Sequence, residues 1–462
     1  LAGAVAVATA GFSLLDLALQ AHHRPYWLST VPNGAVLAFL LLLTVKLWPR
    51  LRASRLRTVL RGSTAGCTRV LIVGAGQTGT MLAHDFQVSR HARCHVVGFV
   101  DDDAGKLHMR LNGVPVLGNR HAIAHLAASM EIDLIAIAIT SSSRDALDDL
   151  ITICQGSGAR VQIVSSLSEM ATRTHASVQL RDLDIADLLG RDEVRLDVAA
   201  CAHYIQGKVV VVTGAAGSIG SELCRQLIHL GPSRLVLLDS NETGLFDLQA
   251  NLRALWSQRT LDMCIADITD EQRIGRVFAR FHPDVVFHAA AYKHVPLLEE
   301  HPCEAVKANV LGTAVLCRAA HHSGVERFVF ISSDKAVAAT NNLGYSKRIG
   351  ELLMRGYAQD STTIFCAVRF GNVIGSRGSV VPTFEHQIAA GGPVTVTDPE
   401  VTRFFMSIPE AACLVIQAAA NASSGSIFML DMGQPVPIIR LAEKMIRLRG
   451  LRVGADVEIV LT

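Results

Sequence analysis

Short apolar runs alternate with segments of helical periodicity along most of this chain, and the alternation starts twice. It first starts at residue 68, where RVLIVGAGQTGTMLAHDF is followed by CHVVGFVDDD and IDLIAIAI. It starts again at 208 with KVVVVTGAAGSIGSELCRQL, followed by RLVLLDSN, LDMCIADITD, DVVFHAAAYKHV, RFVFISSDK and TTIFCAVRFGNV. Strands separated by helices favour a parallel sheet with helices on its faces. The pattern therefore predicts the α/β class, with two tandem Rossmann-type doubly wound parallel sheets.

The same pattern predicts the domain boundaries. We expect a first Rossmann-like domain over 68–180, a polar linker over 181–207 and a catalytic domain over 208–462. Beyond Phe370 the chain is richer in Gly, Pro and Thr, which predicts a small C-terminal substrate cap on the second sheet. The final residues, VEIVLT, have the pattern of an unfinished strand, so we expect the catalytic domain to be truncated there.

Two longer apolar runs, LAGAVAVATAGFSLLDLAL and GAVLAFLLLLTVKLW, precede the first domain, and an arginine-rich segment follows them. The runs approach the length of about 20 residues that crosses a bilayer, and clustered arginines mark its cytoplasmic side. We expect 1–48 to be a partial anchor of transmembrane helices in the inner (plasma) membrane, 49–67 a basic juxtamembrane linker, and the remainder cytoplasmic. Asp16 and Lys46 interrupt the runs, so a buried helical hairpin is the alternative.

Composition narrows the possible functions. The net charge is only +2, which argues against a nucleic-acid-binding protein. The ten cysteines form no Cys-x-x-Cys pair, as is typical of reduced thiols packed in cores, and we expect no metal site.

The second glycine loop predicts a dinucleotide site. Gly214, Gly217 and Gly220 follow a strand and open a helix, whose N-terminus would face the pyrophosphate. Asp239 ends the next strand, where a carboxylate can bind ribose hydroxyls and would repel the extra phosphate of NADP, so NAD is favoured. Asp267 follows the third strand, within reach of the adenine. The predicted cofactor-binding residues are Gly214, Gly217, Ser218, Ile219, Gly220, Asp239, Asp267, Ile268, Ala289, Ala290, Ala291, Tyr292 and Lys347.

The first glycine loop carries less chemistry. Gly74, Gly76 and Gly79 have the same spacing, and Asp101 ends the following strand. No Tyr, Lys or acid–base pair follows in this domain at a matching position. Dinucleotide binding and a packing or regulatory role both remain open for it.

An acid–base pair ends the fifth strand of the second series. In a doubly wound sheet the carboxyl ends of the strands line the ligand crevice, so Ser333, Asp334 and Lys335 are expected beside the nicotinamide. Adjacent acid and base suit a reaction that removes one proton and delivers another. A surface turn carrying a charge pair is the alternative.

The helix that follows lacks the Tyr that many nicotinamide enzymes place four residues before a Lys. Lys347 shares a helical face with Leu343, whereas Tyr345 is about 200° away around the helix at 100° per residue. Lys347 can still hold the nicotinamide ribose, so the acid–base work is assigned to Asp334 and Lys335.

Further polar residues follow strand ends or lie in the predicted cap. Arginine forks match phosphate oxygens well, so a nucleotide sugar is the expected substrate. Taken singly, each of these residues is more often structural. The predicted substrate-binding residues are Lys293, His294, Asn372, Arg377, Ser379 and Arg403.

Five motifs together resemble the membrane-bound UDP-N-acetylhexosamine 4,6-dehydratases, in the polysaccharide-biosynthesis branch of the extended short-chain dehydrogenase/reductases. They are VTGAAGSIGSELCRQL, HAAAYKHVPLLE, SSDKAVAATNNLGYSK, VRFGNVIGSRGSVVPTF and TVTDPEVTRFFMSIPEA. The resemblance covers nearly the whole chain. Leu343 stands where the long family members typically carry Met, and Ser333 where Thr is common.

The resemblance implies a redox cycle that begins and ends with oxidised NAD. The C4 position of the sugar is oxidised, Lys335 removes the C5 proton, Asp334 assists loss of the C6 hydroxyl, and hydride returns to C6. Lys347 holds the ribose. The expected partners are a UDP-sugar (UDP-N-acetylglucosamine first), the membrane, and a second copy of the chain. A UDP-sugar 4-epimerase and a membrane-tethered nucleotide-sugar sensor are the rival hypotheses.

Overall fold

The structure is a computed structural model. It describes residues 67–88, 94–139, 144–164, 180–188, 197–255 and 260–462. The predicted anchor at 1–48 lies outside these ranges, as does nearly all of the basic segment after it. Within the ranges described, no helix is both long enough and apolar enough to cross a bilayer.

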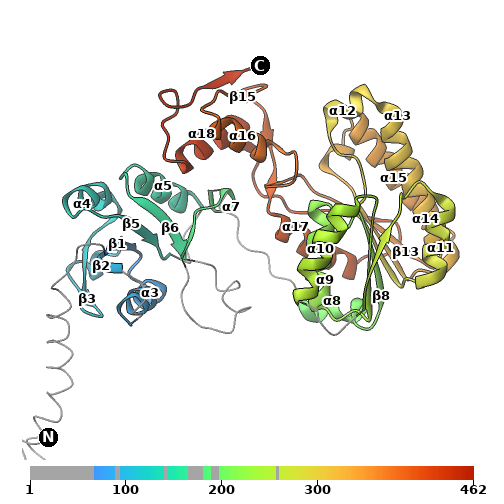
Figure 1. Ribbon diagram of the computed structural model, residues 1–462, viewed down its shortest axis with the longest axis horizontal. Coiled ribbons are helices and arrows are strands. Elements are labelled where there is room, and N and C mark those ends of the chain that lie inside the picture. Colours follow the sequence, from blue (N-terminus) through green and yellow to red (C-terminus); the bar gives the residue numbers. More distant parts are fainter. Residues whose placement is uncertain (1–66, 89–93, 140–143, 165–179, 189–196, 256–259) are drawn as a thin grey trace, which may run out of the picture. The chain divides into compact units, whose positions relative to one another are not determined.

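The first domain is a Rossmann-type sheet with strand order β3-β4-β2-β1-β5-β6-β7 (Figure 1). Strands β1, β5 and β6 run parallel, as do β2 and β4, while the edge strands β3 and β7 pair antiparallel with their neighbours. The strands are β1 Thr68–Val73, β2 Cys94–Val100, β3 Arg110–Leu111, β4 Val114–Gly118, β5 Leu134–Ile137, β6 Arg160–Val164 and β7 Leu180–Asp182. The helices that pack with them are α3 Gln77–Val88, α4 Ile123–Ser129 and α5 Arg144–Gln155.

The segment 181–207, expected to be a linker, carries elements of both domains. Strand β7 extends the first sheet as far as Asp182. A short helix, α7 Ile185–Leu188, follows, and helix α8 Val198–Ile205 belongs to the core of the catalytic domain. Tyr204 on α8 is buried and donates a hydrogen bond of 2.8 Å to the Ile416 carbonyl. The segment is polar on average, and the sequence interpretation therefore did not identify α8 as a core helix of the catalytic domain.

The catalytic domain contains a seven-stranded sheet of order β10-β9-β8-β11-β12-β13-β18, in which every pair is parallel. This is the predicted doubly wound order, with the connection reversing direction between β8 and β11. The crevice beyond the carboxyl ends of these two strands is therefore the place where a ligand is expected. The strands are β8 Val209–Thr213, β9 Arg234–Asp239, β10 Thr260–Ile265, β11 Val285–His288, β12 Arg327–Ile331, β13 Ile364–Arg369 and β18 Ser426–Met429.

Two apolar clusters cover the two faces of this sheet. Alternate residues along each strand point to opposite faces, so Val210 and Val212 join one cluster and Val211 joins the other. Helices α8, α9 Ser218–His229, α10 Glu242–Leu255 and α17 Ile408–Ala420 pack on the first face. Helices α11 Glu271–Phe281, α14 Gly312–Ser323 and α15 Asn342–Tyr357 pack on the second (Figure 1).

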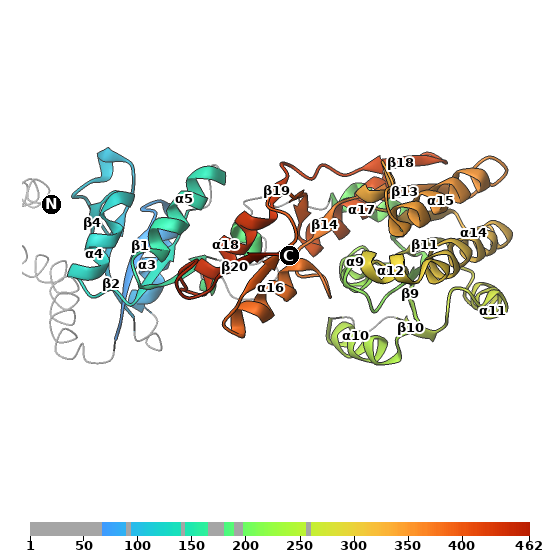
Figure 2. The same ribbon diagram turned by 90° about the horizontal axis from the view of Figure 1, so that it is seen from above.

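The C-terminal part forms a small cap with its own core. Helices α16 Val380–Ala389 and α18 Ile438–Leu448 lie side by side in both views (Figures 1 and 2) and share that core. Strand β15 Val394–Val396 pairs with β20 Ile459–Leu461, within the final segment whose pattern predicted a strand. Two further pairs join β14 Asn372–Val373 to β17 Phe405–Met406, and β16 Thr402–Arg403 to β19 Val436–Pro437.

Candidate active site

A cavity of about 290 Å³ opens at the carboxyl ends of the catalytic strands, beside the glycine loop. It brings together residues from six separate stretches of sequence. Most of the residues predicted to bind the cofactor line it, and Arg377, predicted to bind substrate, lines it too. The predicted residues in its wall are Gly214, Gly217, Asp239, Asp267, Ile268, Ala289, Ala290, Ala291, Tyr292 and Arg377.

The glycines allow close approaches that a larger residue would block. Gly214 has φ +67°, and a Cβ atom there would lie 2.5 Å from the Ala290 nitrogen. A Cβ atom at Gly220 would lie 2.0 Å from the Gly214 carbonyl oxygen, so the helix start packs directly on the turn. The loop therefore leaves a bare backbone cradle at the N-terminus of α9. That is the arrangement that lets a pyrophosphate approach main-chain N–H groups.

The two acidic residues predicted to bind the cofactor also fix the loops around the cavity. Asp239 accepts hydrogen bonds of 2.9 Å from the Ala216 and Asn241 nitrogens, so it ties the end of β9 to the glycine loop. Asp267 accepts hydrogen bonds of 2.8 Å from the nitrogen and hydroxyl of Thr269. Both carboxylates lie in the cavity wall, where ribose and adenine are expected.

Four predicted cofactor residues do not line the cavity: Lys347, described below, and three at the start of α9. Ser218 and Ile219 lie in the first turn of α9, where the Ser218 hydroxyl accepts a hydrogen bond of 3.3 Å from the Arg377 nitrogen. Ile219 packs against the core below the loop. Gly220 is buried under Gly214. These residues support the glycine loop without facing the cavity.

The predicted acid–base pair forms a tight hydrogen-bonded unit at the end of β12. Lys335 Nζ donates to Asp334 Oδ1 at 3.1 Å and to Asn372 Oδ1 at 3.0 Å. Asp334 Oδ1 also accepts from the Ser333 hydroxyl at 2.9 Å and from the Lys335 nitrogen at 2.8 Å. The side chains of Asp334 and Lys335 are 22% and 25% exposed, so they are partly enclosed yet open to a ligand. Among the residues described, none donates a hydrogen bond to Asp334 Oδ2.

Lys347 is buried behind this unit. Its ammonium donates a hydrogen bond of 2.8 Å to the Ile331 carbonyl at the end of β12 and lies 4.8 Å from the centre of the Phe330 ring. Burial lowers the pKa of Lys347 to about 8, although the Glu351 carboxylate acts in the opposite direction. Lys347 does not line the cavity in this structure.

The helix-face argument for Leu343 and Tyr345 agrees with the structure. Helix α15 begins at Asn342, capped by the Asn341 side chain. Leu343 is 6% exposed and packs with Leu298 and Ala305, whereas Tyr345 is 52% exposed. Tyr345 therefore cannot replace the missing Tyr without unwinding the helix start.

Buried His288 is a site residue that the sequence interpretation missed. It ends β11, and its two ring nitrogens lie 2.8 Å from the Thr213 hydroxyl and 3.0 Å from the Thr313 hydroxyl. Burial lowers the pKa of His288 to about 3, and the Lys347 ammonium adds to that effect. The ring is therefore neutral and joins β8, β11 and α14 behind the crevice. Its position in the strand pattern marked it only as a core residue.

A second missed feature is a buried carboxylate beneath the catalytic turn. Glu351 is fully buried and accepts hydrogen bonds from the Ser332 hydroxyl at 2.6 Å and from Arg369 Nε and Nη2 at 2.7 and 2.6 Å. A bond of 3.0 Å from Arg348 Nη1 completes the set. Burial raises the pKa of Glu351, but the hydrogen bonds from Arg369, Ser332 and Arg348 outweigh that effect and lower it overall.

A third missed residue is Asn309, in the π-helical turn Ala305–Leu311. Its side-chain oxygen accepts from the Tyr292 nitrogen at 2.8 Å, and its amide donates to the Tyr292 carbonyl and the Ser346 hydroxyl, each at 3.0 Å. Asn309 therefore fixes the loop that forms one wall of the cavity. A π-helical turn is not visible in sequence periodicity.

The other predicted substrate residues do not line this cavity. Lys293 and His294 follow the alanine stretch, and His294 lies close against Gly378. Ser379 is the N-cap residue of α16, but its side chain accepts no hydrogen bond from the helix backbone. Its hydroxyl has no partner among the described residues. Arg403 is exposed on β16 and donates to the Thr402 carbonyl at 2.9 Å.

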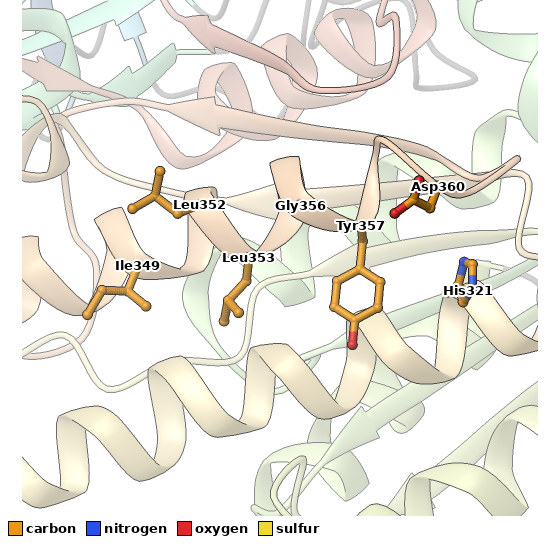
Figure 3. Close-up of a pocket in the computed structure, with 7 residues that line it drawn as sticks. All are labelled: His321, Ile349, Leu352, Leu353, Gly356, Tyr357 and Asp360. Carbon is orange, nitrogen blue, oxygen red and sulfur yellow. The ribbon is translucent and has the colours of Figure 1, made fainter.

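A larger groove of about 500 Å³ lies along α15, but its chemistry is different. Figure 3 shows that it is lined by Ile349, Leu352, Leu353, Gly356 and Tyr357, with His321 and Asp360 at one end. It contains neither the glycine loop nor the Asp334–Lys335 unit. The cavity beside the glycine loop is the candidate active site because it contains that loop and both predicted cofactor carboxylates, although Asp334 and Lys335 do not line it.

The fold and this site define a class. A doubly wound parallel sheet, a glycine loop at the switch point and a polar unit at the end of β12 belong to a nucleotide-binding enzyme with an extended short-chain dehydrogenase/reductase-like fold. More particularly, residues 210–462 match the family described as "Polysaccharide biosynthesis protein", and the chain belongs to that family.

Known proteins similar to this chain include two relatives and one solved structure. "Probable polysaccharide biosynthesis protein EpsC" of Bacillus subtilis (strain 168) is 42% identical over 402 residues, covering 87% of this chain and 67% of that protein. "Uncharacterized membrane protein MJ1061" of Methanocaldococcus jannaschii is 43% identical, covering 52% of this chain and 71% of that protein. "X-ray structure of Pen from Bacillus thuringiensis" has a TM-score of 0.51 and 33% identity, covering 56% and 78%. The chain thus spans about two thirds of the length of EpsC.

The first domain has a family match of its own. Residues 26–165 match the family described as "CoA-binding domain". In the structure, Asp101 accepts a hydrogen bond of 2.7 Å from the Ala75 nitrogen, the same link that Asp239 makes in the catalytic domain. Asp101 also pairs with Lys106 at 3.1 Å, and its pKa is lowered: burial raises it, but the hydrogen bonds from Asp103, Ala75 and Lys106 outweigh burial.

Proposed function

We propose that this chain is the NAD-dependent 4,6-dehydratase of a UDP-N-acetylhexosamine, UDP-N-acetylglucosamine being the first candidate. The product is the UDP-4-keto-6-deoxy sugar, which is made for a surface polysaccharide or glycan. The observation that carries the proposal is the Asp334–Lys335 unit at the end of β12, one strand from the switch point. A 4-epimerase or a sensor has no use for this pair.

The glycine loop fits a dinucleotide. The bare backbone at Gly214 and Gly217 is a cradle that a side chain would fill. Asp239 at the end of β9 favours ribose hydroxyls over a ribose phosphate, which supports NAD over NADP. NAD, when bound, supplies the hydride acceptor for C4 and the hydride donor for C6. Lys347, behind the end of β12, is proposed to hold the nicotinamide ribose.

Lys335 is proposed to act as the base. Once C4 carries a ketone, the C5 proton is acidic, and the Lys335 amine can accept it. Asp334 is proposed to act as the acid, because its Oδ2 accepts no hydrogen bond from the described residues. A proton carried on Oδ2 would pass to the C6 hydroxyl, which leaves as water. Hydride addition at C6 and return of the proton from Lys335 to C5 give the product. The proton released from the C4 hydroxyl in the first oxidation replaces the one that Asp334 gave up, so the net change is the loss of one water.

The substrate phosphates are proposed to lie near the Gly375–Ser379 loop. Arg377 lines the cavity. The Ser379 hydroxyl is buried and has no hydrogen-bond partner among the described residues. Lys293, His294 and Arg403 add cationic or donor groups around the crevice. Positive groups on several loops would surround a pyrophosphate without requiring a metal ligand set.

The cellular setting is also part of the proposal. The apolar runs at 1–48 and the arginines after them favour an inner-membrane anchor with the catalytic domain in the cytoplasm. The relative whose printed name calls it a membrane protein supports this placement. Association with a second copy is proposed as well, and no nucleic-acid partner is expected from the small net charge.

The test is a reaction in deuterated water. The whole chain is incubated with UDP-N-acetylglucosamine and NAD, and the sugar is analysed by mass spectrometry. Loss of one water with one deuterium retained supports dehydration, since the C5 proton must exchange with solvent. Unchanged mass with a new C4 epimer supports a 4-epimerase. Binding without any change in the sugar or in other UDP-sugars supports a sensor.

A further inference from the structure

We propose that Asn372 is a positioning residue that orients the Lys335 amine, rather than a ligand for the substrate phosphates. The proposal rests on the dehydratase function above, in which Lys335 is the base. It reassigns a residue whose sequence context indicated pyrophosphate binding. Its starting point is the hydrogen bond of 3.0 Å from Lys335 Nζ to Asn372 Oδ1.

If the Lys335 amine is neutral, each of its two N–H bonds has one hydrogen-bond acceptor. A neutral amine has two N–H bonds and one lone pair. Asp334 Oδ1 at 3.1 Å and Asn372 Oδ1 at 3.0 Å provide one acceptor for each N–H. The remaining tetrahedral direction then belongs to the lone pair, which is the orbital that must accept the C5 proton. A flexible lysine is thereby given one productive orientation.

The backbone of Asn372 is fixed independently of any ligand. Its nitrogen donates to the Phe404 carbonyl at 2.9 Å, and β14 pairs with β17 on either side of that link. Asp334 is fixed as well, because its nitrogen donates to the Phe370 carbonyl at 3.0 Å. Both acceptors for Lys335 are thus held by the same stretch that follows β13. The fold therefore orients the Lys335 amine before any substrate binds.

The role of Asn372 depends on its amide being uncharged as well as on its oxygen being an acceptor. When Asp334 is ionised it places one carboxylate beside Lys335, and an opposite charge nearby stabilises the protonated lysine. A second carboxylate at position 372 would hold the lysine protonated and remove the base. An amide supplies an acceptor without that charge, so it orients the amine while leaving it able to deprotonate.

Two substitutions separate these contributions. Asn372→Asp keeps the acceptor and adds charge, whereas Asn372→Leu keeps approximate size and removes the acceptor. For Asn372→Asp we expect the acidic limb of the kcat–pH profile to move up by about one pH unit or more. For Asn372→Leu we expect kcat to fall by about tenfold to a hundredfold. In both variants KM for the UDP-sugar should stay within about threefold of the parent value.

Asn421→Asp is the matched control. Asn421 lies at the C-terminal end of α17, and its side-chain amide donates to the Gln417 carbonyl at 3.3 Å. It adds the same charge to the same domain, and it should leave both kcat and the pH profile unchanged. Melting temperatures of all three variants exclude loss of folding as the cause.

The amine itself gives a readout that does not depend on turnover. Competitive acetylation of the whole chain at a series of pH values, followed by mass spectrometry of the Lys335 peptide, gives the pKa of that amine. We expect a higher pKa for Lys335 in Asn372→Asp than in the parent or in Asn421→Asp. If the parent makes no deoxysugar, the dehydratase proposal fails while this arm still decides the role of Asn372.

Two results would overturn the inference. A KM increase of about tenfold or more with an unchanged kcat–pH profile would show that Asn372 binds substrate. An unmoved Lys335 pKa in Asn372→Asp would show that the two side chains do not interact in solution.

Discussion

Replacing Glu351 by Gln tests whether one buried carboxylate holds the catalytic elements together. The Glu351 side chain is fully buried and accepts hydrogen bonds from Ser332 on the segment after β12 and from Arg369 on β13. Gln keeps the size of the side chain but loses the charge, and its amide nitrogen would face hydrogen-bond donors. Arg369, only 15% exposed, would be left without its anionic partner.

The expected loss of stability is large. Removing one partner of a buried ion pair costs about 3–5 kcal/mol. In a domain of roughly 250 residues, each kcal/mol lowers the melting temperature by about 2–4 °C. The catalytic-domain transition of Glu351→Gln should therefore fall by about 6–20 °C in scanning calorimetry of the whole chain.

Glu271→Gln is the control for this prediction. Glu271 pairs with Arg318 at 2.6 Å, but the two side chains are 62% and 47% exposed. Glu271 also pairs with an arginine, but the pair is exposed and lacks the further hydrogen bonds of Glu351, so this variant should melt close to the parent. Equal melting temperatures for the two variants would refute the argument that burial makes the Glu351 network strong.

The pH dependence gives an independent check. Because the pKa of Glu351 is lowered in the folded state, its stabilising effect is fully present above the unfolded-state value of about 4.3. That effect is lost as the pH falls through the lowered folded-state pKa. The difference in melting temperature between the parent and Glu351→Gln should therefore shrink in acid and stay constant near neutral pH.

Three further substitutions test other parts of the site. Gly220→Ala should abolish NAD binding in isothermal titration calorimetry, because the new Cβ would lie 2.0 Å from the Gly214 carbonyl oxygen; Gly275→Ala, which meets no atom within 4 Å, should bind normally. Lys335→Ala should abolish dehydration in the mass-spectrometric assay while NAD affinity stays unchanged, and normal turnover would contradict its role as the base. Leu343→Tyr should weaken substrate binding and lower the melting temperature without producing a 4-epimerase, because the hydroxyl would enter an apolar cluster.

The backbone of the fold could be predicted because its signals are local. Each strand of the catalytic sheet is a short apolar run, and the order of runs and helices specifies a doubly wound sheet. The segment 181–207 was harder to interpret because the short apolar helix α8 follows a long polar stretch. The apolar face of α8 became visible only when Tyr204 was seen packed against α17, more than two hundred residues away in sequence.

Some residues of the candidate site could likewise be predicted from the sequence and others could not. Asp334 and Lys335 follow a strand closely, so their place after the carboxyl end of β12 could be derived from topology alone, while their role at the crevice stays a prediction. Glu351 could not be found this way, because an acid on an amphipathic helix is normally a surface residue. It is buried because Arg369 on the neighbouring strand and Ser332 after β12 compensate its charge, and both partners are distant in sequence.

Asn372 shows why residue type and position do not by themselves give a role. An Asn after a strand in a glycine-rich stretch suggested phosphate binding, and its place near the crevice agrees with that expectation. Its oxygen, however, is already occupied by Lys335, and a hydrogen bond between residues 37 positions apart requires three-dimensional information. The same contact joins the segment that follows β13 to the acid–base unit after β12. Chemistry at the proposed active site therefore depends on the register of β14 with β17 as much as on the strand that carries Lys335.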